Sequence, residues 1–469
     1  MPTANDAPVK GHVLHHWDPE NPEFWERTGA RIARRNLWIS IISLTLSFAI
    51  WVLWSVVTVN LDKVGFRFTS NQLFWLTALP ALSGATLRVF YSFMVPIFGG
   101  RRWTVISTLS LLLPAVGMGI ALQDSSTSYS TLLILAALCG LGGGNFSSSM
   151  ANISFFYPKA KKGTATGLNA GIGNLGVSLA QFVVPLVISS AMVGSFTGEG
   201  LHYVEKGVEK TLWLQNAGFV WVPFIVISVI LAWFGMNDIA DAKASFKDQA
   251  IIFRRKHNWL MCWLYVGTFG SFIGFSAGLA LLTKSQFPDV NPTQYAFLGP
   301  LVGALTRPVG GWISDRLKAG ATVTLYTFLL MVLAVVGVLF TLPSEGHAGN
   351  FPAFLGMFIL LFALSGIGNG STFRMIPVIF LTARTQEAEK TPEAQRQAVV
   401  QGNKEASAVL GFSGAVGAYG GFFIPKSFGT SLEATGSVDM ALYAFIAFYL
   451  SCMVVTWWFY ARKGARTPC

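Results

Sequence analysis

Twelve long apolar segments constrain the fold of this chain more than any other feature of its sequence. Each is long enough to span a membrane as a helix, because about 20 residues at 1.5 Å rise cross the roughly 30 Å hydrocarbon layer. The expected extents are 36–60, 72–98, 103–122, 131–157, 164–192, 213–236, 259–283, 293–313, 321–343, 352–382, 404–429 and 437–461. Only 12% of the residues are charged, whereas an ordinary soluble domain carries roughly a quarter. The sequence therefore predicts an all-α polytopic membrane protein.

Lysine and arginine are distributed unevenly among the loops. The two tails and the loops on their side, with the adjoining Lys404, hold 24 of them, whereas the opposite loops hold five: Lys63, Arg67, Lys206, Lys210 and Lys284. The positive-inside rule assigns the richer side to the cytosol. We therefore expect both termini to be cytosolic, and the net charge of +11 requires no nucleic-acid partner. Residues 1–35 are polar and lack the apolar core of a cleavable signal peptide.

Three short motifs recur in the same order in the two halves of the chain. The pairs are GATLR at 84–88 with GALTR at 303–307, GLGGGN at 140–145 with GIGNGS at 366–371, and GNLG at 173–176 with GAVG at 414–417. Transporters are often built from duplicated six-helix units. We expect two pseudo-repeated six-helix bundles, at 36–236 and 259–461, joined by a cytosolic linker at 237–258. Residues 1–35 and 462–469 are then cytosolic tails.

The first pair of motifs ends in an arginine inside the membrane in each half. An arginine at that depth costs several kcal/mol unless it faces a polar cavity, and such residues usually mark a substrate or ion path. We interpret Arg88 and Arg307 as one site. The predicted helices contain no deep carboxylate to neutralise them, since Asp315 and Glu405 are expected at helix ends. An anion from outside is then the simplest partner, and the planar guanidinium fork suits carboxylate, nitrate, nitrite or phosphate.

The other candidate residues for this site are small or aromatic. Glycine lets helices approach closely, which narrows a cavity and favours a small ligand, although helix packing alone also accounts for glycine at such positions. The candidates are Phe146, Asn174, Tyr265, Phe269, Gly144, Gly173, Gly411 and Gly414. GIGNLG at 171–176 has neither the preceding strand nor the later acid of a dinucleotide site. The cysteines and histidines show no metal-ligand spacing, so we expect no cofactor, no metal and no enzymatic activity.

Several long segments resemble one transporter family. GLNAGIGNLGVS at 167–178 and GFSGAVGAYGGFFIPKSFG at 411–429 are similar to the two glycine-rich signature segments of the NarK-type nitrate/nitrite porters, in the major facilitator superfamily. RRNLWIS, VPIFGGRRW, NFSSSMANISFFYPK and TFGSFIGFSAG resemble the same family, so the likeness extends through nearly the whole chain. It implies twelve helices in two bundles (the major facilitator fold) and a bacterial plasma (inner) membrane location.

The resemblance also implies roles for individual residues. The family's two substrate arginines correspond to Arg88 and Arg307, its aromatic residues flanking the planar anion to Phe146, Tyr265 and Phe269, and its signature asparagine to Asn174. The chain departs from the family pattern at Ala170, Gly414 and Arg374. Arg374 either extends toward the cytosolic end of its helix or adds a third charge to the anion path.

These observations predict a secondary transporter that exchanges nitrate for nitrite by alternating access. Proton coupling usually requires Asp, Glu or His along the path, and none is expected there, which favours exchange over proton-coupled nitrate symport. An anion channel or a sensor is a further alternative, but a duplicated twelve-helix chain suits alternating access better. The expected partners are nitrate, nitrite and the lipid bilayer, and we expect a monomer to be functional.

Overall fold

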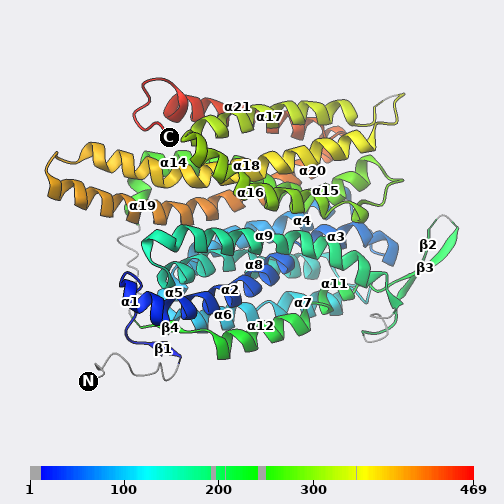
Figure 1. Cartoon of the computed structure of the whole chain (residues 1–469). Coiled ribbons are helices and arrows are strands. Elements are labelled where there is room, and N and C mark those ends of the chain that lie inside the picture. The colour runs from blue at the N-terminus through cyan, green and yellow to red at the C-terminus, as the bar shows by residue number, and fades with distance from the viewer. Residues whose placement is uncertain (1–11, 192–196, 206, 241–249, 345) are drawn as a thin grey trace.

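The computed structural model describes residues 12–191, 197–205, 207–240, 250–344 and 346–469. Two helical bundles lie side by side, one built from each half of the chain, with their helices running in a common direction (Figure 1). Residues 241–249 of the linker expected at 237–258 lie outside the described residues. The observed architecture is the predicted one, a helical protein of two six-helix halves.

The N-terminal half begins with a helix that is longer than its apolar segment. Helical structure runs from Pro22 to Asn60, so it includes part of the segment expected as a tail. The elements are α1 Pro22–Phe24, η2 Trp25–Gly29, α2 Ala30–Trp51, α3 Trp54–Val57, η3 Thr58–Asn60, η4 Asp62–Val64, α4 Ser70–Tyr91, α5 Met94–Phe98, α6 Gly100–Leu109, α7 Leu112–Ala121, α8 Tyr129–Phe156, α9 Lys159–Ile188, α11 Asn216–Phe219 and α12 Val222–Gly235.

The C-terminal half repeats this pattern. Its elements are η5 Ala250–Arg254, α14 Lys256–Tyr265, η6 Val266–Gly270, α15 Ser271–Gln286, η7 Pro292–Gln294, α16 Leu298–Leu317, α17 Gly320–Thr341, α18 Phe351–Glu387, α19 Pro392–Ala418, α20 Gly420–Thr435, α21 Asp439–Thr456 and η8 Trp457–Ala461. Helices α18 and α19 extend beyond the other helices at the end of the molecule that carries both termini (Figure 1). Helix α19 begins earlier than expected because Thr391 caps its first turn and Pro392 occupies the first helical position, where the missing N–H of proline is harmless.

Two small strand pairs mark the two ends of the molecule. β1 Val13–Leu14 pairs in parallel with β4 Asp238–Ile239 at the end that carries the termini, here called the termini end. β2 Leu201–Glu205 and β3 Val208–Leu212 form an antiparallel hairpin at the opposite end, here called the hairpin end (Figure 1).

Among the described residues, eleven helices are long and apolar enough to cross a membrane. The twelfth predicted span corresponds to α16, which is 20 residues long and packs along α18 within the bundle. It carries Arg307, Asp315 and Arg316, and these charges lower its mean hydropathy. Its length and position match those of the other spans, so the expected number of twelve is retained.

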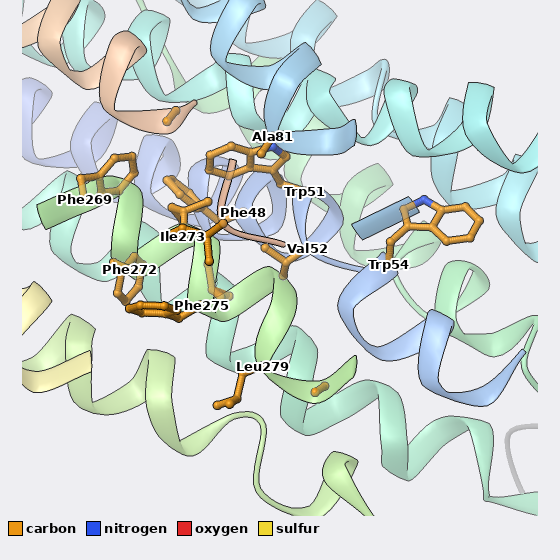
Figure 2. Close-up of a cluster of buried hydrophobic side chains, with 14 of the residues drawn as sticks. Phe48, Trp51, Val52, Trp54, Ala81, Phe269, Phe272, Ile273, Phe275 and Leu279 are labelled. Carbon is orange, nitrogen blue, oxygen red and sulfur yellow. The ribbon is translucent and has the colours of Figure 1, made fainter. Parts of the chain in front are cut away.

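Several polar contacts between the two halves lie toward the hairpin end. Lys284 Nζ bonds Asp62 Oδ1 at 2.6 Å, and Gln181 Nε2 donates to the carbonyl of Ser276 at 2.6 Å. No salt bridge joins the halves at the termini end within the described ranges. Apolar side chains from both halves, such as Phe48 and Ile273, gather in one buried cluster between them (Figure 2). The molecule is thus closed at the hairpin end.

Candidate functional site

Arg88 lies on α4 and is fully buried, with 0% of its surface exposed. Its Nε donates to the carbonyl of Gly143 at 2.9 Å, and its Nη1 donates to the carbonyl of Gly414 at 2.6 Å. Gly143 belongs to the same half, whereas Gly414 lies on α19 in the other half. The Arg88 guanidinium therefore joins the two halves and leaves Nη2 with no hydrogen-bond partner among the described residues.

Close approach of α4 and α8 places Arg88 against the backbone of α8. A Cβ added to Gly84 would lie 2.7 Å from the Trp51 Nε1 and 3.1 Å from the Gly143 Cα. Any larger residue at Gly84 would push these helices apart, and the Gly143 carbonyl would move out of reach of Arg88. The glycines of the GATLR and GLGGGN motifs thus set the position of the arginine.

Arg307 occupies the equivalent place on α16 and is 8% exposed. Its Nη2 donates to the Tyr265 hydroxyl at 3.3 Å, and its guanidinium carbon lies 5.3 Å from the centre of the Phe373 ring. Its Nη1 is buried and has no hydrogen-bond partner among the described residues. Each arginine therefore keeps one unsatisfied N–H group, which is costly in a buried position.

Aromatic rings connect the two arginines. The Arg88 guanidinium carbon lies 4.6 Å from the Phe146 ring centre and 5.2 Å from that of Phe269. Phe146 and Phe269 are stacked with centroids 6.4 Å apart, and Phe269 is stacked on Tyr265 at 5.5 Å. The structure thus brings Arg88, Phe146, Phe269, Tyr265 and Arg307 together in one buried group, built from both halves.

The predicted glycines of α8 and α9 have packing contacts. A Cβ on Gly144 would lie 3.0 Å from the Tyr91 ring, and one on Gly173 would lie 2.7 Å from the Leu44 side chain. Neighbouring Asn174 is buried, and its Oδ1 has no hydrogen-bond partner in the described part of the chain. This carboxamide oxygen lacks a donor, whereas the two arginines lack an acceptor.

The predicted glycines of α19 differ from each other. A Cβ on Gly414 would touch the Phe146 ring at 3.4 Å, so this glycine belongs to the arginine and aromatic group. Gly411 is exposed, and a Cβ there would have open space around it. Gly411 lies three residues before Gly414, almost one helical turn closer to the termini end.

Two further aromatic residues contact the arginines and were not predicted. The Trp51 ring centre lies 4.9 Å from the Arg88 guanidinium carbon, and the Trp51 indole N–H donates to the Pro80 carbonyl at 2.7 Å. Trp51 lies beside Phe48 in the buried cluster (Figure 2), and Phe373 packs on Arg307. A single aromatic residue in an apolar helix gives no local signal that separates these contacts from ordinary packing.

Arg374 forms a salt bridge with Asp315, with Nε 2.8 Å from Oδ1. Asp315 is two residues from the end of α16, and its side chain is exposed. Arg374 therefore extends toward the termini end of its helix, which is the first of the two alternatives given above for this residue. Arg374 is neutralised by a carboxylate, in contrast to Arg88 and Arg307.

Glu405 requires a correction. It was expected at a helix end, but α19 begins at Pro392, so Glu405 lies inside that helix and is 2% exposed. It bonds Arg384 at the end of α18 and lies 3.3 Å from Arg255. This buried carboxylate therefore forms ion pairs with arginines at the termini end and does not contact Arg88 or Arg307.

The chemistry available to the arginine group is anion binding. The described residues place no carboxylate within hydrogen-bonding distance of Arg88 or Arg307, and each guanidinium has a free N–H group. Planar guanidinium groups donate paired hydrogen bonds to planar oxyanions. The described residues also hold no group of three or more His, Cys, Asp or Glu side chains that could bind a metal ion.

Comparison with known proteins places this chain in a family. Residues 37–400 match the Major Facilitator Superfamily. The nitrate/nitrite transporter NarU of Escherichia coli (strain K12) is 52% identical over 96% of this chain and 97% of its own. The probable nitrate/nitrite antiporter NarK2 of Thermus thermophilus is 42% identical over 98% of this chain and 99% of its own.

A solved structure with a similar fold is that of a D-xylose-proton symporter, with a TM-score of 0.64 over 91% of this chain and 97% of that chain. At 12% identity this likeness concerns the fold alone. The near full-length identity to nitrate/nitrite transporters is the more specific result. The chain therefore belongs to the Major Facilitator Superfamily and, within it, to the NarK-type nitrate/nitrite porters.

Proposed function

We propose that the chain transports nitrate and nitrite across the bacterial inner membrane, and that it exchanges one for the other. The anion binds between Arg88 and Arg307, with Phe146 and Phe269 against its faces. One observation supports this most directly: two buried guanidinium groups, one from each half, share an aromatic group and contact no carboxylate among the described residues. The relatives named as nitrate/nitrite transporters support the choice of substrate.

Exchange follows from the charge of this site. Arginine stays protonated near neutral pH, so an unoccupied site carries two positive charges. Closing the halves around uncompensated charges costs several kcal/mol of desolvation. A bound monoanion cancels part of that charge and accepts hydrogen bonds from the unpartnered guanidinium nitrogens. Both effects lower the free-energy barrier to reorientation. Nitrate and nitrite are both planar monoanions, so either one permits the crossing.

The termini end faces the cytosol in this proposal, because it carries most of the Lys and Arg residues. Residues 36–236 and 259–461 then rock against each other within a single monomer. Each half supplies one arginine, so each reorientation moves the two arginines relative to each other. Separation at the hairpin end, where Lys284 contacts Asp62, opens the route to the periplasm.

Counterflow in proteoliposomes tests the function. Purified protein is reconstituted with nitrite inside, and entry of labelled nitrate is compared with entry into vesicles that contain no permeant anion. We expect rapid entry only in the first case, with one nitrite leaving per nitrate. Vesicles that contain the Arg88→Gln protein serve as the leakage control. This variant has an uncharged side chain at position 88, so we expect no transport by it, and any nitrate that enters these vesicles measures leakage. Equally fast uptake without internal anion would contradict exchange, and absence of nitrate entry in both cases would contradict nitrate transport altogether.

A further inference from the structure

A cationic stripe runs along the exposed face of α2 near the termini end. Arg31, Arg34, Arg35 and Trp38 are all exposed and lie three or four residues apart, with one adjacent pair, so they share one helix face. They line a groove of about 430 Å³ whose other members are Glu26 and Ala30. Three arginines and one glutamate give this groove a net positive charge.

Two of the three arginines have no hydrogen-bond or salt-bridge partner in the described part of the chain, although Arg34 lies close enough to Tyr157 to interact with it electrostatically. Arg35 Nη2 donates to the Asn237 side chain at 2.7 Å, which fixes its orientation. Arg31 and Arg34 have no hydrogen bond or salt bridge to any described residue. Their side chains are exposed at adjacent turns of α2, so both guanidinium groups are available to the same ligand.

The stripe continues directly into an apolar surface. Trp38 is 49% exposed and Ile42, one turn further, is 43% exposed. Helix α2 packs against α9 and α12 and lies between them (Figure 1). Phe234 near the end of α12 is also exposed. Tryptophan is enriched where the hydrocarbon layer meets the headgroups, so Arg31 and Arg34 lie at headgroup depth.

We propose that this groove binds an anionic phospholipid of the leaflet at the termini end. The lipid phosphodiester is held by Arg31 and Arg34, whose planar donors match phosphate oxygens. The acyl chains lie along Trp38 and Ile42. A soluble phosphate would use the arginines but leave the adjoining apolar surface unused, which is why the ligand is a lipid. Basic pockets among membrane helices bind such headgroups in other proteins.

Native mass spectrometry of the full chain in detergent tests this site. Phosphatidylglycerol and phosphatidylcholine of identical acyl chains are titrated against the wild type, the double variant Arg31→Gln/Arg34→Gln and a control, Lys390→Gln/Arg396→Gln. The control removes two exposed charges at the same end of the molecule. We expect the wild type and the control to prefer phosphatidylglycerol. The double variant should lose at least about tenfold in its affinity for that lipid, since it lacks both guanidinium groups that hold the phosphodiester.

Three outcomes would overturn the proposal. Equal loss in the control variant would mean that only net charge matters. An unchanged preference in Arg31→Gln/Arg34→Gln would place the lipid elsewhere. Displacement of the lipid by millimolar glycerol 1-phosphate would indicate a site for soluble phosphates. Nitrate and nitrite are absent from all samples, so the result is independent of the proposed transport. Thermal unfolding of each variant without lipid checks that the fold is retained.

Discussion

At the scale of single residues, the two arginines are held by different contacts. Arg88 is fixed by two backbone carbonyls, from Gly143 and Gly414, whereas Arg307 is fixed by the Tyr265 hydroxyl. Both groups lie against aromatic rings, whose faces attract cations. The geometry depends on a planar group with donors in several directions, which lysine cannot reproduce.

We expect Arg88→Lys and Arg307→Lys each to reduce nitrate exchange at least tenfold, equivalent to about 1.4 kcal/mol. The charge is retained, but one ammonium cannot bond Gly143, Gly414 and an anion together. Initial rates of counterflow measure the loss, and Arg396→Lys, at an exposed position outside the site, serves as the control. A Tm within a few degrees of wild type shows that the variants fold. Near-normal exchange by either variant would remove that arginine from the site.

At the scale of helices, α4 and α20 form the principal contact between the halves toward the hairpin end. Lys426 Nζ bonds Asn71 Oδ1 at 2.8 Å, and Asn71 Nδ2 bonds Glu433 Oε2 at 2.5 Å. Asn71 at the start of α4 is therefore held by a cation and an anion of α20. Deeper in the contact, a Cβ added to Gly421 would lie 2.7 Å from the Ala81 Cβ. Alternating access requires these two helices to separate.

A disulfide between α4 and α20 should stop transport. Disulfides need Cβ atoms about 3.5–4.5 Å apart, so Ala81→Cys with Gly421→Cys requires a shift of about 1 Å. We expect oxidation of the double variant to abolish nitrate exchange and reduction to restore it. The single variants, treated with the same oxidant, measure the effect of each substitution alone, and oxidation should not change their exchange rates. Exchange that persists after complete crosslinking would show that these helices stay together during transport, contrary to the proposed rocking motion.

At the scale of the whole molecule, the charge of the site determines the coupling in the mechanism that we propose. The titratable groups of the arginine and aromatic group are Arg88, Arg307 and Tyr265, and none of these side chain types ordinarily titrates between pH 6 and 8. A one-for-one exchange of monoanions also moves no net charge. The carrier should therefore respond to neither a proton gradient nor a membrane potential.

We expect the rate of nitrate/nitrite exchange in proteoliposomes to change less than about twofold between pH 6 and 8, because the arginines stay protonated throughout. A potassium diffusion potential of either sign should leave the rate unchanged. The dependence of the rate on pH and on membrane potential is measured with the same vesicles. Vesicles without protein measure the leakage under each condition. A rate that rises steeply as the external pH falls, with uptake into anion-free vesicles, would favour proton-coupled symport.

Much of the fold was predictable because its signals are local. Hydropathy marked the spans, and the paired motifs at 84–88 and 303–307 indicated two halves. The span corresponding to α16 fell below the hydropathy of the others, and its equivalence to α4 rested on the repeated motif that ends in Arg307. The helix ends were less predictable, as α19 shows, because polar helical turns continue beyond the membrane where hydropathy gives no signal.

The sequence by itself determined the membrane-spanning helices, the duplication and the two buried arginines, since each depends on residue type and spacing along one segment. Only the tertiary structure decided which groups meet. It paired Arg374 with Asp315, buried Glu405 against Arg384, and placed Trp51 and Phe373 on the two arginines. These partners come from different helices, and their contacts depend on helix rotation and close approach at glycines such as Gly84 and Gly143. Such contacts are properties of packing, which the local sequence pattern does not specify.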